Sequence, residues 1–318
     1  MLEVQHLVKR YGSKTAVEDL TFTIQDTGVY GLLGPNGAGK STTMNIVTGY
    51  ISATSGTVLV QGQDIVAQAA AAKRCIGYLP EQPPLYPDMT VEEYLRFAAE
   101  LKGIRPKTAR CEAVRTVCDR VGLQGTGRRL IANLSKGYRQ RVGIAAALLG
   151  EPKIIILDEP TVGLDPAQVL EVRSLIRELG KTHTVILSSH ILSEVQSICD
   201  DVLILAHGKL IARGTPNELA QRLSAKGSIS ATAQGSREDV LRAAAGVAGL
   251  QNITVTAEEN GEISFTAESA AGADLRGALS QALTAAGCPV LRLSAQTASL
   301  EDVFLQLTDA APAKEEQL

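Results

Sequence analysis

Two stretches of the 318-residue chain have the residue types and spacing needed for phosphate chemistry, and the first follows an apolar run at residues 29–33. The pattern G-x-x-x-x-G-K-[ST] is completed there by Gly34, Gly39, Lys40 and Ser41. Glycines let the backbone bend around a polyphosphate, and a following helix adds its positive N-terminal end. A glycine-rich turn that merely caps a helix is the alternative, but the flanking strand and helix patterns favour a nucleotide site.

Each part of this loop has an expected role. Lys40 is expected to reach the terminal phosphates, and the Ser41 hydroxyl to bind a magnesium ion. The predicted loop contacts to the nucleotide are Gly34, Pro35, Asn36, Gly37, Ala38, Gly39, Lys40, Ser41 and Thr42. Upstream, Tyr11 is an aromatic residue that can either stack on a nucleobase or simply form a turn.

The second stretch is IIILDEP at residues 154–160, where four apolar residues end in two adjacent carboxylates. Such a run is typical of a strand buried on both faces. Asp158 is placed to hold the magnesium shell, whereas Glu159 can orient or deprotonate an attacking water. The pair can also cap the next turn, but its combination with the phosphate loop favours a hydrolytic site.

Three more positions carry candidate polar groups. Gln82 follows a strand predicted at 76–81 and can supply an oxygen to magnesium or water, although such a side chain can also face solvent. His190 ends a strand predicted at 184–190, where it can contact the γ-phosphate or act structurally. Asn133 or Ser135 can cap a predicted helix that continues to Leu149, and the Ser135 hydroxyl with the Gly137 backbone forms either an anion site or part of an ordinary cap.

Periodicity predicts an α/β chain with a change of character near residue 226. Short antiparallel strands are predicted at 3–10, 17–24 and 57–62. Predicted helices occupy residues 40–48, 90–102, 107–121, 135–149 and 166–179, and a hairpin occupies 201–213. The Ala- and Gly-rich remainder is predicted as strand 228–234, helix 236–245, strands 251–257 and 261–267, helix 273–286, strand 289–295 and helix 299–308. This β-α-β-β-α-β order fits a ferredoxin-like module with an added helix.

Composition limits the partners and the compartment. The 31 basic and 34 acidic residues give a net charge of -3, which provides no general attraction to nucleic acid. No signal segment precedes Glu3, and no apolar run approaches the ~20 residues that a membrane span needs, so we expect a soluble, cytoplasmic chain. The five cysteines show no C-x-x-C pair and are expected to be reduced thiols.

Together these motifs resemble the ATP-binding subunits of ABC transporters in order and spacing, over residues 2–222. The resemblance implies an ABC ATPase fold with an antiparallel β subdomain and a helical subdomain at about 95–150. It further implies that Tyr11 stacks on adenine, that Gln82 forms the Q-loop and that Asp158 and Glu159 are the Walker B pair. Asp165, which caps the helix at 166–179, would be the D-loop residue, and His190 the switch histidine. An accessory α+β domain would follow at 226–310, with a flexible tail at 311–318.

The signature LSGGQ of that family is replaced by Leu134-Ser135-Lys136-Gly137-Tyr138, a variant similar to the gliding-motility and related subunits of the ABC-2 exporter type. Membership of this type implies hydrolysis of ATP with Mg²⁺ and a head-to-tail dimer in which each phosphate loop faces the partner subunit's serine at position 135. It also implies a separate ABC-2 type transmembrane permease and a peripheral location on the inner face of the cell membrane. The loop after Gln82 and the helix near Tyr86–Phe97 are the expected docking surface.

Two other functions are compatible with a phosphate loop. A soluble ABC-type ATPase can act on ribosomes or DNA without a permease, but such proteins usually carry two cassettes or a long coiled-coil insertion, and this chain has neither. A phosphate-loop kinase of another family is disfavoured by Glu159 after Asp158 and by the Ser135 segment. For the C-terminal domain, regulation, dimer contact and stabilisation remain alternatives.

Overall fold

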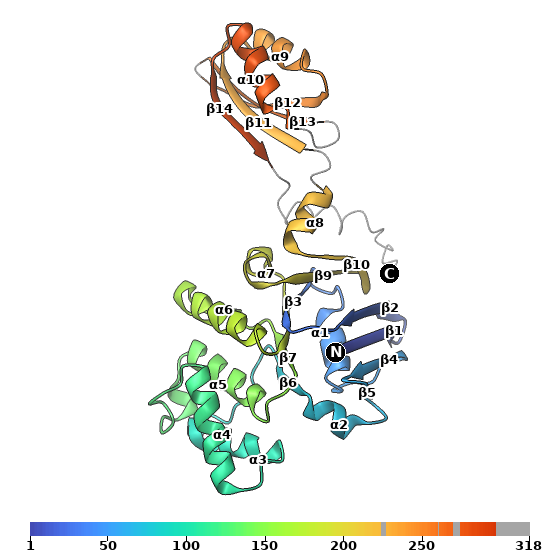
Figure 1. The fold of residues 1–318 in the computed structure, drawn as a ribbon, viewed down its shortest axis with the longest axis vertical. Helices are drawn as coiled ribbons and strands as arrows, with labels where there is room; N and C mark the ends of the chain where they lie inside the picture. The colour runs from blue at the N-terminus through green and yellow to red at the C-terminus, as the bar shows by residue number, and fades with distance from the viewer. Residues whose placement is uncertain (224–226, 260, 270–273, 297–318) are drawn as a thin grey trace. The chain divides into compact units, whose positions relative to one another are not determined.

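The computed structural model describes residues 1–223, 227–259, 261–269 and 274–296, and these divide at Pro216 and Asn217 into two compact units (Figure 1). The helix predicted at 299–308 and the tail predicted at 311–318 lie outside the described residues. Among the residues that the structure describes, every helix is too short or too polar to span a bilayer.

The first unit is built around a six-stranded sheet with the order β10-β9-β3-β8-β7-β6. Its strands are β3 (Gly28–Leu33), β6 (Ile76–Leu79), β7 (Ile154–Asp158), β8 (Thr184–Ser189), β9 (Asp201–Ala206) and β10 (Lys209–Gly214). All neighbours pair in parallel except β9 and β10, which form an antiparallel hairpin. Every residue of β3, β7 and β8 is buried, which explains their continuous apolar sequences.

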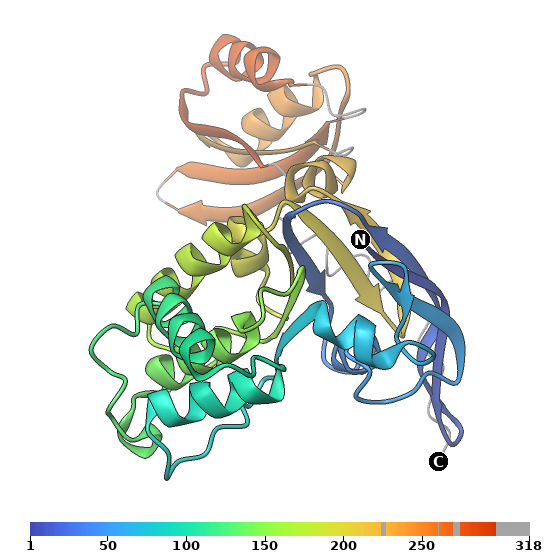
Figure 2. The same ribbon diagram turned by 60° about the horizontal axis from the view of Figure 1, so that its bottom comes forward.

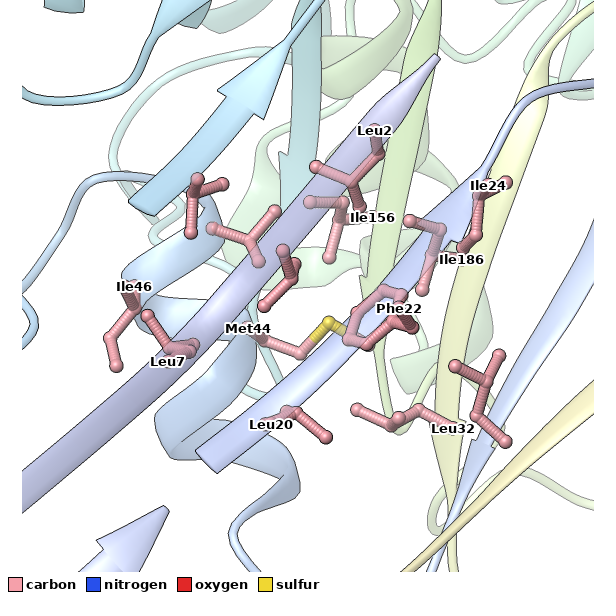
Figure 3. Close-up of a cluster of buried hydrophobic side chains, with 14 of the residues drawn as sticks. Leu2, Leu7, Leu20, Phe22, Ile24, Leu32, Met44, Ile46, Ile156 and Ile186 are labelled. Atoms are coloured by element: carbon pink, nitrogen blue, oxygen red, sulfur yellow. The ribbon is translucent and has the colours of Figure 1, made fainter. Parts of the chain in front are cut away.

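A smaller antiparallel sheet covers one face of the central sheet. It consists of β1 (Leu2–Tyr11), β2 (Lys14–Ile24), β4 (Ser55–Val60) and β5 (Gln63–Asp64), in the order β2-β1-β4-β5. Figure 3 shows Leu7, Leu20 and Phe22 of this sheet packed around Met44 of α1 (Lys40–Val47), with Ile156 and Ile186 of the central sheet in the same cluster. The phosphate loop therefore joins two elements that share one hydrophobic core.

Helices cover the remaining surfaces (Figures 1 and 2). Helices α3 (Val91–Leu101), α4 (Lys107–Arg120) and α5 (Lys136–Leu148) contact one another, and α5 also contacts β6. Helices α6 (Pro166–Gly180) and α7 (Leu192–Ile198) contact β3 and β8. Helices α7 and α2 (Ala69–Arg74) and strand β5 are not predictable from the sequence, because seven, six and two residues are too few for a periodic pattern to appear.

The second unit has the predicted β-α-β-β-α-β order. Its elements are β11 (Gly227–Gln234), α9 (Arg237–Ala245), β12 (Leu250–Glu259), β13 (Glu262–Ser269), α10 (Arg276–Ala285) and β14 (Val290–Gln296). The strands form one antiparallel sheet in the order β12-β13-β11-β14, which is the ferredoxin-like arrangement. Helix α8 (Pro216–Leu223) leads into the unit, whose own core contains Phe265 and Leu279.

Phe265→Ala tests whether this second core stabilises its unit. The Phe265 side chain is 0% exposed, so its removal should lower the local free energy of unfolding by about 3–5 kcal/mol. Hydrogen exchange of the β13 amides in the full chain measures this change. Leu291→Ala is the matched control, because that side chain is 51% exposed and its removal should change protection little. Equal protection in both variants would contradict the assignment of Phe265 to the core.

Candidate active site

The phosphate loop connects the end of β3 to the start of α1 and lies against two neighbouring strands. Gly39, the residue before α1, has φ 101°, and a Cβ there would lie 2.5 Å from the carbonyl oxygen of Ala16 in β2. At Gly34 a Cβ would lie 2.5 Å from the carbonyl oxygen of Leu205 in β9. Only glycine therefore fits at both positions, because a side chain would collide with fixed backbone.

Lys40 is the first residue of α1 and is only 7% exposed. Its Nζ donates to the carbonyl oxygen of Gly34 at 2.6 Å and to that of Pro35 at 3.2 Å. Burial lowers the pKa of Lys40, while the nearby carboxylates of Glu159 and Asp158 act in the opposite direction. The ammonium group thus lies inside the loop, where phosphate oxygens would compensate its charge.

A cleft of about 420 Å³ opens beside the loop. Of the predicted site residues, those that line it are Tyr11, Asn36, Gly37, Gly39, Lys40, Ser41, Thr42, Glu159 and His190. Tyr11 is half exposed at the rim, and Lys9 Nζ lies 5.0 Å from the centre of its ring. Gln82 does not line the cleft, whereas the preceding residue, Glu81, does.

Glu159 and His190 contact each other at the wall of this cleft. His190 Nδ1 lies 2.9 Å from Glu159 Oε1, with side chains 47% and 12% exposed, respectively. The other carboxylate oxygen of Glu159, Oε2, is buried and has no hydrogen-bond partner within the described part of the chain. A carboxylate that lines the cleft and is held in place by histidine can act as a base towards a water molecule there.

Ser188 is a site residue that the sequence analysis missed. Its Oγ donates to Asp158 Oδ1 at 2.5 Å and accepts from the backbone N–H of Glu159 at 3.0 Å. Strand β8 lies between β3 and β7, and Ser188 is paired with Asp158 in the ladder. The signal in the sequence was a polar pair, Ser188 and Ser189, at the end of an otherwise apolar strand.

The residues around Ser135 form a surface site that is separate from the cleft at the phosphate loop. Ser135 caps α5 and accepts from the backbone N–H of Tyr138 at 3.4 Å, while Asp165 caps α6 and accepts from Gln168 N–H at 2.9 Å. Gly137 and Asp165 line a second cleft of about 420 Å³. None of Ser135, Gly137 and Asp165 lines the cleft at the phosphate loop. One chain therefore does not bring together the two predicted halves of the nucleotide site, which are the phosphate loop and the Ser135 segment.

The donors present at the phosphate loop suit a magnesium ion that is bound jointly with phosphate. Within the described ranges there is no group of three or more His, Cys, Asp or Glu side chains that could hold a metal unaided. The Ser41 hydroxyl lines the cleft, and the Asp158 carboxylate lies at the end of β7, 6% exposed. Mg²⁺ takes oxygen ligands and is usually bound by one or two carboxylates together with substrate phosphates and waters.

Ser188→Ala should misalign the acidic pair. The substitution removes the donor to Asp158 and leaves the partly buried Glu159 N–H without its acceptor, so the free energy of unfolding should fall by about 1–3 kcal/mol. The rate of ATP hydrolysis should fall at least tenfold, measured by phosphate release. Ser197→Ala is the control, because that hydroxyl donates to a carbonyl of its own helix, α7. Wild-type hydrolysis by Ser188→Ala would show that this hydroxyl does not align the site.

Comparison with known proteins agrees with this geometry. Residues 17–162 match the family model described as ABC transporter. The chain is 35% identical to the linearmycin resistance ATP-binding protein LnrL of Bacillus subtilis (strain 168), over 97% of this chain and 98% of that protein. It is 40% identical to the bacitracin transport ATP-binding protein BcrA of Bacillus licheniformis, over 66% of this chain and 68% of that protein.

A solved structure of an ATP binding subunit of an ABC transporter superposes with a TM-score of 0.63 at 32% identity, over 70% of this chain and 93% of that one. The fold is thus shared with a solved structure of this family, and the sequence is similar to its members over most of the chain. The chain belongs to the ATP-binding subunits of ABC transporters, and it is an ATPase.

Proposed function

We propose that this ATPase is the motor subunit of an exporter of the ABC-2 type, the type that includes the gliding-motility subunits. The observation that carries the proposal is the Glu159–His190 contact of 2.9 Å beside the phosphate loop, which equips the cleft for hydrolysis as well as binding. Relatives named for linearmycin resistance and bacitracin transport support export of an antimicrobial compound. The motor would act at the inner face of the cell membrane.

In this proposal each side chain of the cleft has one task. Lys40 and the loop N–H groups bind the phosphates, and Tyr11 stacks on the adenine. Ser41 and Asp158 would hold Mg²⁺, with Gln82 reaching it when the loop after β6 moves, and the ion would neutralise charge that develops on the phosphates. The Glu159 carboxylate accepts the proton of the attacking water, and His190 holds it in place through Oε1.

The proposed working form is a dimer. Within one chain, Gly137 and Asp165 line a different cleft from the phosphate loop. In a head-to-tail dimer the loop of one subunit would face Ser135 at the start of α5 in the other, where an N-terminal dipole favours the γ-phosphate. ATP would then join the two subunits through charge-assisted hydrogen bonds, and hydrolysis would release them.

Glu159→Gln tests both the base and the dimer. An amide cannot accept the proton, so ATP turnover should fall by about 10²–10⁴-fold, whereas ATP binding should persist and hold the subunits together. Phosphate release measures turnover, and size-exclusion chromatography with and without ATP measures the dimer. Glu178→Gln is the matched control, because that carboxylate is 69% exposed at the end of α6. Retained turnover in Glu159→Gln would exclude Glu159 as the base.

An exposed aromatic cluster is the proposed docking surface for the permease. The ring of Tyr86 lies 5.8 Å from that of Phe97 and 6.2 Å from that of Tyr94, centre to centre. Tyr86 is 51% exposed and Phe97 37%, and both follow Gln82 closely in the chain. Aromatic side chains are enriched where proteins bind one another, and this position would transmit movement of the Gln82 loop to a membrane partner.

Tyr86→Ala combined with Phe97→Ala should abolish co-purification of a multi-span membrane protein from a detergent extract. The two rings provide the apolar contact area, so their truncation removes the docking surface while the melting temperature reports that the fold is kept. Tyr50→Ala is the control, since that ring is 79% exposed on another part of the surface. If the wild-type chain instead co-purifies with ribosomes or DNA and with no membrane protein, a soluble ABC-type ATPase is the correct assignment.

A further inference from the structure

Glu194, on α7, is a buried carboxylate to which the proposed reaction gives no task. It is 5% exposed, and a buried charge is costly unless it is paired or hydrogen-bonded. Its Oε2 accepts from Thr161 Oγ1 at 2.6 Å and from Ser189 Oγ at 3.3 Å. Its Oε1 lies 3.5 Å from Arg173 Nη2. These partners come from the loop after β7, the end of β8 and helix α6.

Two of these partners flank the proposed reacting groups. Thr161 comes two residues after Glu159, and Ser189 directly precedes His190. The Ser189 hydroxyl also accepts from the backbone N–H of Ile191 at 3.0 Å. This bond joins the residue before His190 to the residue after it. With the Glu159–His190 contact, a closed ring results that runs from Glu159 through Thr161, Glu194 and Ser189 to His190.

We propose that Glu194 is a positioning residue of the ATPase site, which keeps Glu159 and His190 aligned by fixing the segments on which they are carried. The inference rests on the roles proposed above for those two residues. Glu159 has φ 48°, a conformation that a residue with a side chain keeps only when its surroundings impose it. His190 has a side chain that is 47% exposed, so few neighbours hold it directly.

The ring also extends to α6. Arg173 lies two turns into that helix, whose N-terminal end is capped by Asp165. Glu194 thus joins the segment that carries Asp165 to those that carry Glu159 and His190, at the point where all three meet behind the cleft. Glu194 therefore provides one route by which a shift of α6 would reach the reacting pair.

Steady-state hydrolysis by the purified full-length chain tests the proposal. Glu194→Ala should lower kcat at least tenfold and leave KM for ATP within twofold, because none of its partners belongs to the phosphate loop. Glu194→Gln should recover a large part of kcat, because an amide oxygen still accepts from Thr161 and Ser189. Glu178→Ala removes an exposed carboxylate from α6 and should leave both constants unchanged.

A double-mutant cycle with His190→Ala separates positioning from general destabilisation. If Glu194 acts through His190, then Glu194→Ala should lower kcat much less in the His190→Ala background than in the wild type. Thr161→Val and Ser189→Ala remove one hydroxyl each and should each lower kcat with KM unchanged, which keeps the test open if Glu194→Ala does not fold. Binding of a fluorescent ATP analogue should be the same in all of these variants.

Three results would overturn the proposal: unchanged kcat in folded Glu194→Ala, a rise in KM without loss of kcat, or equal effects of Glu194→Ala with and without His190. Where Glu194→Ala does not fold, unchanged kcat in both Thr161→Val and Ser189→Ala would overturn it as well. Glu159→Gln distinguishes failure of the roles proposed for Glu159 and His190 from failure of the positioning role proposed for Glu194. If that variant retains turnover, the roles of the reacting pair are wrong; if it is inactive while the cycle is additive, only the positioning role of Glu194 is wrong.

Discussion

The position of β8 between β3 and β7 is the constraint on which the site depends. Because the three strands are parallel, their C-terminal ends meet at one edge of the sheet, and that edge carries the phosphate loop, the acidic pair and His190. The intervening strand brings the Ser188 hydroxyl between the loop and Asp158. A different strand order would leave Glu159 and His190 on separate parts of the edge.

The antiparallel sheet has a part in this arrangement beyond covering the core. The carbonyl of Ala16 in β2 lies so close to Gly39 that it excludes any side chain, and Tyr11 at the end of β1 lines the same cleft. The buried residues of the antiparallel sheet share one cluster with Met44 of α1 and with Ile156 and Ile186 of the central sheet (Figure 3). The shape of the phosphate loop is therefore maintained by hydrophobic packing on both sides of it.

The two compact units differ in what they offer chemically. The described residues that line the cleft, and the polar network around Glu194, belong to the first. The ferredoxin-like unit has a separate core in which Phe265, Leu279 and Leu283 are fully buried. Regulation, dimer contact and stabilisation remain proposals for it.

The sequence by itself determined the local features. The phosphate loop, the strand that ends in Asp158, the cap of α3 and the β-α-β-β-α-β order were all predictable, because each depends on residues close in the chain. Thr90 and Glu93, for example, form a capping box at the start of the helix predicted at 90–102, with the Thr90 N–H bonded to the Glu93 carboxylate at 2.8 Å. The ABC family followed from the spacing of these same motifs.

Only the tertiary structure decided which of these groups meet. The strand order, the Glu159–His190 contact and the two bonds of Ser188 join residues about thirty positions apart, and no local pattern records such a distance. Helix α7 was too short to be predicted, and with it the network of Glu194 was invisible in the sequence. The resemblance to the family already implied that the Ser135 segment and the phosphate loop lie apart within one chain, and the structure places Gly137 in a cleft separate from that of the loop.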